Sequence, residues 1–231
     1  KLKSICYRHI GDGSNINVFG IGPIDTFINR GEITFIVGGN GSGKSTLLKV
    51  VSLHYPAVSG QISFDDIAVT SENINSYRAQ IACIYSDYYL FKQLHIDYSN
   101  DAKAEAQINY YLDVLELKEK VQFQDGHFST LKLSDGQRRR LALLVAFLDD
   151  KELYVFDEWA ADQDPHFKKI FYLDILPNLK ARGKSVVAIS HDDRYFHVAD
   201  RVLVMDEGKL VENKNEPAKE NLSAASLFSF S

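Results

Sequence analysis

Cysteine, long apolar runs and an excess of charge are all scarce in this chain. The 231 residues include only two cysteines, Cys6 and Cys83, which lie far apart without the spacing of a metal site. Two such thiols are typical of buried or half-buried free cysteines in a reducing compartment, and we assign them no chemistry. The longest apolar run, residues 141–148, is much shorter than the roughly 20 residues of a membrane-spanning helix, so we expect no membrane crossing here.

The net charge is also small. At −5, with a pI near 5.8, the chain has no general attraction for nucleic-acid phosphates, so we expect no nucleic-acid partner. The one dense basic run, residues 138–140, begins a predicted helix, where a solvated face beside a phosphate site is a simpler interpretation than a nucleic-acid patch. The chain starts at Lys1 without a methionine or a secretory-type apolar run, which suggests a piece of a longer polypeptide.

What the chain does have is the pattern of an α/β protein. Its composition, 45% apolar and 25% charged, is that of a globular domain with a substantial core. A β-type run at residues 33–37 leads into a glycine-rich turn and a predicted helix at 44–53. Other elements follow the same logic, with buried strands at 153–156, 185–189 and 202–205 and helical segments at 137–148 and 166–180. We therefore predict a mainly parallel sheet with helices on its faces.

Two further regions complete the predicted organisation. The residues before Glu32 and those at 61–64 favour strands, which could form an antiparallel β layer beside the main sheet. Residues 87–135 turn to helical spacing, as in 102–117, and predict an inserted helical subdomain. We expect one domain over residues 1–211 and a loosely ordered polar tail over 212–231.

The glycine-rich turn fits the pattern G-x-x-x-x-G-K-[ST] and lies between a predicted strand and a predicted helix, as a phosphate-binding loop requires. Its backbone amides and the positive end of the helix dipole would hold the β- and γ-phosphates of ATP. Lys44 supplies a positive charge to those phosphates, and Ser45 offers a hydroxyl to Mg²⁺. The residues predicted to contact ATP here are Gly38, Gly39, Asn40, Gly41, Ser42, Gly43, Lys44, Ser45 and Thr46.

An apolar strand at residues 153–156 ends in two acids, Asp157 and Glu158. Ligands of open α/β sheets bind at the carboxyl ends of the strands, so both carboxylates should face the phosphate loop. Asp157 fits the carboxylate associated with Mg²⁺ in phosphate-loop ATPases. Glu158 is placed to orient and deprotonate the attacking water.

Residues 133–137, Leu-Ser-Asp-Gly-Gln, resemble the LSGGQ signature of ATP-binding-cassette (ABC) proteins, with Asp in place of one Gly. Ser134 and the amides of Gly136 and Gln137 open a helix whose N-terminus can meet a γ-phosphate. The resemblance implies that this phosphate belongs to a second protomer, so we expect ATP to bring two copies together head to tail. It also implies a phosphate-loop NTPase core with an antiparallel β layer and an inserted helical subdomain.

Other family elements follow in order. Residues 162–165, Asp-Gln-Asp-Pro, look like the family's D-loop, and residues 189–192 look like its switch-histidine segment. The resemblance implies that His191 contacts the γ-phosphate and holds the water and Glu158 in place. Tyr7 matches the adenine-stacking aromatic of the family, although packing in the core remains an alternative for one of 12 tyrosines.

The stretch from residue 156 to 167, with residues 176–177 and 191–193, resembles the exporter branch for cyclic peptides, microcins and siderophore precursors. That resemblance implies a transmembrane domain on the N-terminal side of the same full-length chain, and peptide-like cargo. The domain would then work at the cytoplasmic face of the inner membrane. A soluble ABC-type ATPase acting on DNA or ribosomes is an alternative, but its usual coiled coils and basic surface are not visible. Glu158 and His191 argue against a regulator that does not hydrolyse ATP.

One departure from the family concerns the loop after residue 84. A Gln that touches Mg²⁺ is usual there, and this chain has Ser86 instead. The Ser hydroxyl is too short to span the same distance, so either a water bridges Ser86 to the metal or Asp87 takes its place. The sequence leaves both possibilities open.

Overall fold

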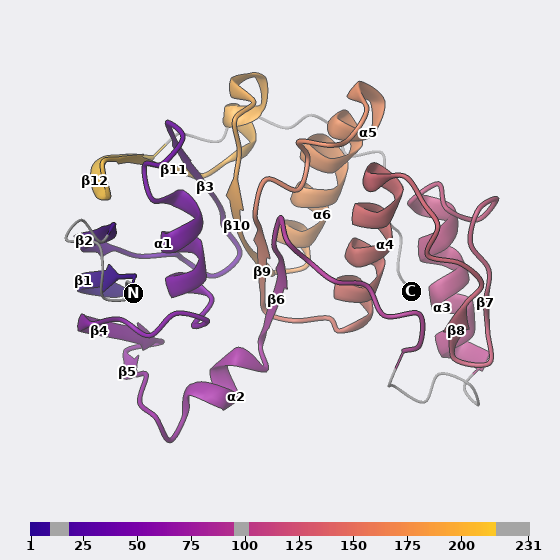
Figure 1. Ribbon diagram of the computed structural model, residues 1–231, viewed down its shortest axis with the longest axis horizontal. Helices are drawn as coiled ribbons and strands as arrows, with labels where there is room; N and C mark the ends of the chain where they lie inside the picture. The colour runs from indigo at the N-terminus through magenta and orange to yellow at the C-terminus, as the bar shows by residue number, and fades with distance from the viewer. Residues whose placement is uncertain (10–18, 95–101, 216–231) are drawn as a thin grey trace, which may run out of the picture.

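The computed structural model describes residues 1–9, 19–94 and 102–215. Figure 1 shows a layered arrangement: an antiparallel sheet, then helix α1 (Lys44–Val51), then the main sheet, then the remaining long helices. The predicted α/β fold with a second β layer is confirmed. No helix in these described segments is long and apolar enough to cross a membrane.

The main sheet has six strands in the order β12-β11-β3-β10-β9-β6. All its neighbouring strands pair in parallel except the edge strand β12, which is antiparallel to β11. The strands are β3 (Ile33–Gly38), β6 (Ile81–Ile84), β9 (Leu153–Phe156), β10 (Ser185–Ile189), β11 (Arg201–Asp206) and β12 (Lys209–Asn215). All four of the predicted buried strands, at 33–37, 153–156, 185–189 and 202–205, therefore match to within one residue at each end.

Burial on both faces explains why these strands read as continuous apolar runs. Along β9, Tyr154 and Phe156 join the core that packs under the long helices, whereas Leu153 and Val155 join the core under α1. All four residues of β9 are buried. Successive side chains of a strand point to opposite faces, so two helical layers require apolar residues at every position.

The antiparallel sheet has the order β2-β1-β4-β5 and covers α1 from the other side. Its strands are β1 (Leu2–Arg8), β2 (Gly20–Thr26), β4 (Ser59–Phe64) and β5 (Ile67–Ala68). A short helix, α2 (Ile74–Arg78), follows β5 and leads to β6. The strands expected before Glu32 and at 61–64 are thus present.

The helical segment predicted at 166–180 is interrupted. It consists of α5 (Pro165–Ile170), one π-helical turn (Phe171–Ile175) and α6 (Leu176–Ala181). Pro177 lies in the first turn of α6 and has no backbone N–H, so the regular ladder of hydrogen bonds cannot continue through it.

The inserted region at 87–135 holds a hairpin as well as a helix. Its described part contains α3 (Ala102–Val114) and a hairpin of β7 (Phe123–Gln124) and β8 (His127–Phe128). Helix α4 (Asp135–Leu148) then packs against the sheet, and figure 1 places α3, β7 and β8 beyond it.

The C-terminal boundary also differs. Strand β12 runs to Asn215, so residues 212–215 pair with β11 instead of belonging to a loose tail. The rest of the predicted tail, residues 216–231, lies outside the described residues.

Candidate nucleotide site

The phosphate loop connects the end of β3 to the start of α1, as the sequence predicts. Gly38 has a φ of 143°, and a Cβ built on it would lie 2.1 Å from the carbonyl oxygen of Met205, so a side chain cannot fit there. Gly43 caps α1 with a φ of 102°. These left-handed glycines let the backbone curl around an anion at the start of the helix.

Lys44 lies inside the curl of this loop. Its Nζ donates hydrogen bonds to the carbonyl oxygens of Gly38, at 3.0 Å, and Gly39, at 2.8 Å, and the residue is only 5% exposed. An ammonium group has three N–H donors, so one is left after these two bonds. The loop itself therefore fixes the charge where the β- and γ-phosphates would lie.

Three oxygen-bearing side chains, those of Ser45, Ser86 and Asp157, meet at the end of β9. The Ser45 hydroxyl donates to Oδ1 of Asp157 at 3.1 Å, and the Ser86 hydroxyl donates to Oδ2 at 3.4 Å. Burial raises the pKa of Asp157, and the hydrogen bond from Ser45 offsets part of that shift. Ser86 and Asp87 are both exposed, and it is the Ser86 hydroxyl that lies at the carboxylate.

These oxygens suit Mg²⁺ better than a metal that needs an all-protein cage. Mg²⁺ is commonly held by one or two carboxylates together with substrate phosphates and water. Within the described segments, no three His, Cys, Asp or Glu side chains gather as a metal-binding group. The fit is thus to a cation that arrives with a nucleotide and meets Ser45 and Asp157.

The next residue, Glu158, is joined to His191 across the ends of β9 and β10. His191 Nε2 lies 2.9 Å from Oε1 of Glu158, and both side chains are partly exposed, at 45% and 37%. Glu158 has a φ of 51°, which is uncommon for a residue with a side chain. The two predicted catalytic side chains therefore come together although 33 residues separate them.

The signature residues begin α4 with a capping box. Ser134 Oγ accepts a hydrogen bond from the amide of Gln137, and the Gln137 side chain accepts one from the amide of Ser134. A Cβ on Gly136 would lie 3.0 Å from the carbonyl oxygen of Asp162, which is tight. The sequence pattern thus both starts the helix and lets it approach the segment after Glu158.

The interpretation of residues 138–140 as a solvated face is wrong for two of the three arginines. Arg139 and Arg140 are 7% and 8% exposed. Arg139 pairs with Asp162, and Arg140 pairs with Glu116 and Asp164. A run of like charges gives no sign of such partners, because the acids come from other elements.

Tyr7, in strand β1, is already stacked on another ring. Its ring is parallel to that of Tyr55, with centroids 4.7 Å apart, and it meets His9 edge-on. His9 reaches the end of the loop, because its Nε2 lies 3.4 Å from the hydroxyl of Thr46. Its ring also neighbours that of Phe19. Sequence reasoning missed His9, although its place two residues after Tyr7, on the same side of an extended chain, could have suggested it.

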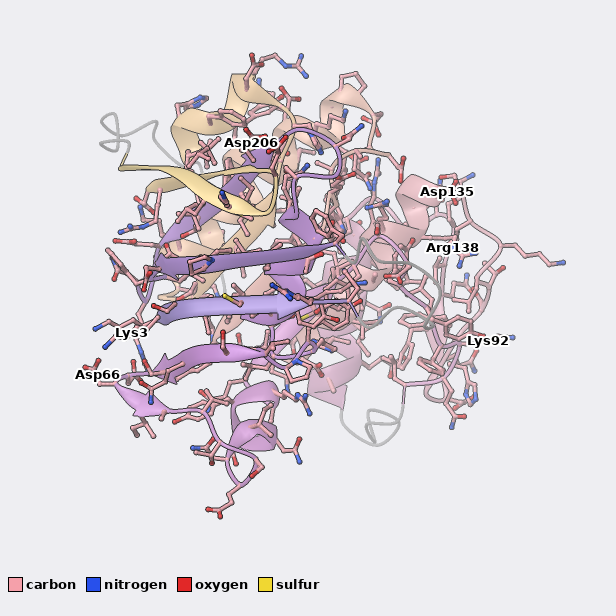
Figure 2. All side chains as sticks on the ribbon, turned by 60° about the vertical axis from the view of Figure 1, so that its left-hand side comes forward. Lys3, Asp66, Lys92, Asp135, Arg138 and Asp206 are labelled. Carbon is pink, nitrogen blue, oxygen red and sulfur yellow. The ribbon has the colours of Figure 1, made fainter. Side chains whose placement is uncertain are left out.

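Helices α1 and α4, whose N-termini are both predicted to meet phosphate, lie on opposite sides of the main sheet. Helix α1 packs in the core shared with the antiparallel layer, and α4 packs in the core on the other face. In Figure 2, Asp135 and Arg138 of α4 lie on the side of the molecule away from Lys3 and Asp66 of the antiparallel layer. This separation does not suit contact of both helix starts with one phosphate.

Comparison with protein families matches residues 21–161, more than half of the chain, to the family described as ABC transporter. The chain belongs to the ABC transporter family. It is an ATP-binding, ATP-hydrolysing domain of that family, as the signature at residues 133–137 predicts.

Individual relatives agree with the assignment. The ATP-binding protein SyrD of Pseudomonas syringae pv. syringae is 42% identical over 214 residues, which is 92% of this chain and 38% of SyrD. The chain therefore spans well under half of that relative. Among solved structures, a dimeric ATP-binding cassette bound to ADP and phosphate has a TM-score of 0.79 at 19% identity, and covers 94% of this chain and 98% of its own. A bacterial Atm1-family ABC exporter with ATP bound has a TM-score of 0.73 at 20% identity, over 93% of this chain and 38% of its own. At these identities the two structures show the fold alone.

Proposed function

We propose that this domain is the MgATP-driven motor of a membrane exporter and that it works as a head-to-tail dimer. The observation that carries the proposal is the cluster at the ends of β3, β9 and β10. There the enclosed Lys44 ammonium, the Ser45–Asp157 contact and the Glu158–His191 pair occupy one edge of the sheet. Such an edge is where open α/β sheets bind their ligands.

Each group has a role that its geometry supports. The loop amides and Lys44 hold the β- and γ-phosphates, and Ser45 and Asp157 hold Mg²⁺. The ion would neutralise charge that develops on the phosphate oxygens. Glu158 accepts the proton of the attacking water, and His191, 2.9 Å from its carboxylate, keeps that carboxylate in position. We also propose that Tyr7 or its neighbour His9 stacks on adenine.

Ser86 is the better candidate for the metal-sensing place. It hydrogen-bonds the same carboxylate that would hold the ion, from the loop directly after β6. A serine hydroxyl that reaches the carboxylate directly supports a role in fixing that ligand, with a water bridging to the metal.

Dimerisation completes the site. The starts of α1 and α4 lie on opposite sides of the sheet, so the phosphates held by one protomer need Ser134, Gly136 and Gln137 of a second copy. The cassette to which this chain is similar in fold is itself dimeric. ATP would close two copies, and hydrolysis with release of ADP would open them.

A transmembrane domain is the proposed partner, joined on the N-terminal side of the full-length chain. Exposed aromatic rings follow β6: Tyr89 is 76% exposed and Phe91 63%, and their ring centroids lie 5.0 Å apart. Beside them a hollow of about 200 Å³ is lined by β6, by Leu90 and by residues of α4 such as Ala142 and Val145. This apolar surface adjoins Ser86, so a membrane domain seated there could sense the metal site.

The exporter assignment and its direction rest on similarity. The stretch from residue 156 to 167 resembles exporters of peptide-like cargo. We therefore propose peptide-like cargo and a position at the cytoplasmic face of the inner membrane.

Mixing two inactive variants tests the composite site. A dimer of one Lys44→Ala copy and one Ser134→Arg copy contains one site with both defects and one with neither. Differently tagged copies are co-expressed, and mixed dimers are purified through both tags. We expect each variant alone to be inactive and the mixed dimer to recover part of the ATP turnover. Mixed dimers without any recovery would contradict the head-to-tail arrangement.

Glu158→Gln supplies a second, independent readout. The amide keeps the shape of the side chain but cannot accept the proton of water, so ATP should stay bound and the closed dimer should accumulate. Mass in solution with MgATP should double for Glu158→Gln. It should not double when Ser134→Arg is added, and a monomer in both cases would argue against ATP-driven closure.

A further inference from the structure

The backbone of Glu158 is held from the signature helix of its own chain. Arg139 Nη1 donates to the carbonyl oxygen of Glu158 at 3.0 Å, and Nε1 of Trp159 donates to the carbonyl oxygen of Arg139 at the same distance. Arg139 Nη2 also lies 2.7 Å from a carboxylate oxygen of Asp162. Glu158 and Trp159 are thus both bonded to Arg139 of α4. Glu158 accepts a hydrogen bond from Arg139, and Trp159 donates one to it.

The two donor side chains are buried, and of the two bonds that of Trp159 is fully buried and that of Arg139 to Glu158 is part-buried. Arg139 is 7% exposed and Trp159 is 1% exposed. The indole of Trp159 stacks on Phe171, with ring centroids 4.4 Å apart, so it cannot swing away without disturbing the core. A charge-assisted hydrogen bond between groups that water reaches poorly is among the stronger polar contacts in a protein.

The residue held in this way is the one that needs support. Glu158 has a φ of 51°, in the left-handed region that residues with side chains rarely adopt. Its conformation sets the direction of the carboxylate that pairs with His191. Strained backbone persists at functional sites only where the surrounding structure determines it. Two donors hold the Glu158 carbonyl oxygen, each at 3.0 Å: the amide of Ala161 in the local turn and the Arg139 guanidinium.

The start of α4 is docked on the same segment. Gln163 Nε2 donates to the carbonyl oxygen of Gly136 at 3.0 Å, and Arg140 Nε donates to Oε1 of Gln163. The absence of a side chain on Gly136 allows this approach, because a Cβ would lie 3.0 Å from the carbonyl oxygen of Asp162. The first turns of α4 and the segment from Glu158 to Gln163 are therefore one bonded unit.

We propose that Arg139 is a positioning residue for Glu158 and that, with Trp159, it links two different active sites. This proposal rests on the head-to-tail dimer proposed above. In that dimer the start of α4 contacts the nucleotide of the partner, whereas Glu158 serves the nucleotide of its own chain. Any shift of α4 caused by one nucleotide is passed through Arg139 to the carboxylate at the other.

Single variants separate positioning from folding. Arg139→Ala should lower kcat about tenfold or more, since a misplaced catalytic group loses rate steeply, and should leave KM for ATP within about twofold. Trp159→Phe, which keeps the ring but removes the donor, should lower kcat less. Arg139→Lys should recover part of the rate, because an ammonium can reach one acceptor but not both. Arg30→Ala is the control. It removes an exposed arginine that is paired with Asp65, and it should leave kcat unchanged.

The mixed dimer shows in which of its two copies Arg139 is required for turnover. Its working site takes Glu158 from the Ser134→Arg copy and the signature helix from the Lys44→Ala copy. Adding Arg139→Ala to the Ser134→Arg copy should remove about nine-tenths or more of the recovered turnover. Adding it to the Lys44→Ala copy should remove less than about half.

Every outcome decides the question. Equal losses in the two positions, or a larger loss in the Lys44→Ala copy, would overturn the positioning role. Lack of recovery before Arg139 is changed would contradict the proposed dimer instead. In that case the link between two active sites falls with the dimer, and the single variant decides the positioning role: a kcat of Arg139→Ala equal to that of the parent would refute it.

Discussion

Replacing Lys44 with alanine is the most direct test of where the phosphates bind. In the folded protein two of the three ammonium donors are used by the loop carbonyls of Gly38 and Gly39, at 3.0 and 2.8 Å. One donor and the full positive charge remain for the β- and γ-phosphates. Because the group is 5% exposed, water screens that charge poorly.

The size of the effect follows from this burial. Loss of a hydrogen bond to a charged group weakens binding by about 2–3 kcal/mol. Each 1.4 kcal/mol of binding free energy changes the affinity about tenfold. Lys44→Ala should therefore weaken MgATP binding about 30-fold to 140-fold and abolish measurable turnover. Lys3, exposed on the antiparallel layer, offers a matched control: Lys3→Ala removes a lysine far from the loop and should change neither quantity.

The assay combines titration with a fluorescent ATP analogue and steady-state release of phosphate. Thermal unfolding of Lys44→Ala should remain cooperative, which shows that a loss of binding is not a loss of fold. Turnover by Lys44→Ala near the parent rate would refute the assignment of residues 38–46 as the phosphate loop.

Three further predictions concern the rest of the site. If Tyr7 stacks on adenine, Tyr7→Ala should weaken ATP and GTP alike by about 1–3 kcal/mol; a loss in His9→Ala but not in Tyr7→Ala, measured by the same titration, would move that role to His9. Ser86→Ala should raise the Mg²⁺ concentration for half-maximal turnover while Asp87→Asn does little, and the reverse pattern would give the role to Asp87. Burial raises the pKa of Asp157, so its ionised form destabilises the nucleotide-free fold at neutral pH. Asp157→Asn should therefore raise the melting temperature at pH 7, and the gain should shrink as the pH falls below the raised pKa and the parent carboxyl takes up its proton; a gain that is independent of pH would contradict this reasoning.

Local pattern was enough to predict the elements that carry the chemistry. The glycines and Lys44 lie within one short loop, and loop geometry depends on residues that are neighbours in the chain. Apolar runs such as residues 153–156 and 185–189 gave the strands, because burial on both faces leaves an unbroken apolar signature. The rule that ligands meet the carboxyl ends of parallel strands then predicted that Asp157 and Glu158 face the loop.

Contacts between distant segments were beyond the reach of that reasoning. Periodicity says which side of an element is buried but not which partner it meets, so the approach of Ser86 to Asp157 appears only in the folded chain. Arg139 shows the same limit most clearly. Among three consecutive arginines it looks like surface charge, and only the packing of α4 on the segment after β9 buries it against Glu158 and Asp162. A charged side chain takes its role from what surrounds it, and that surrounding exists only once the chain has folded.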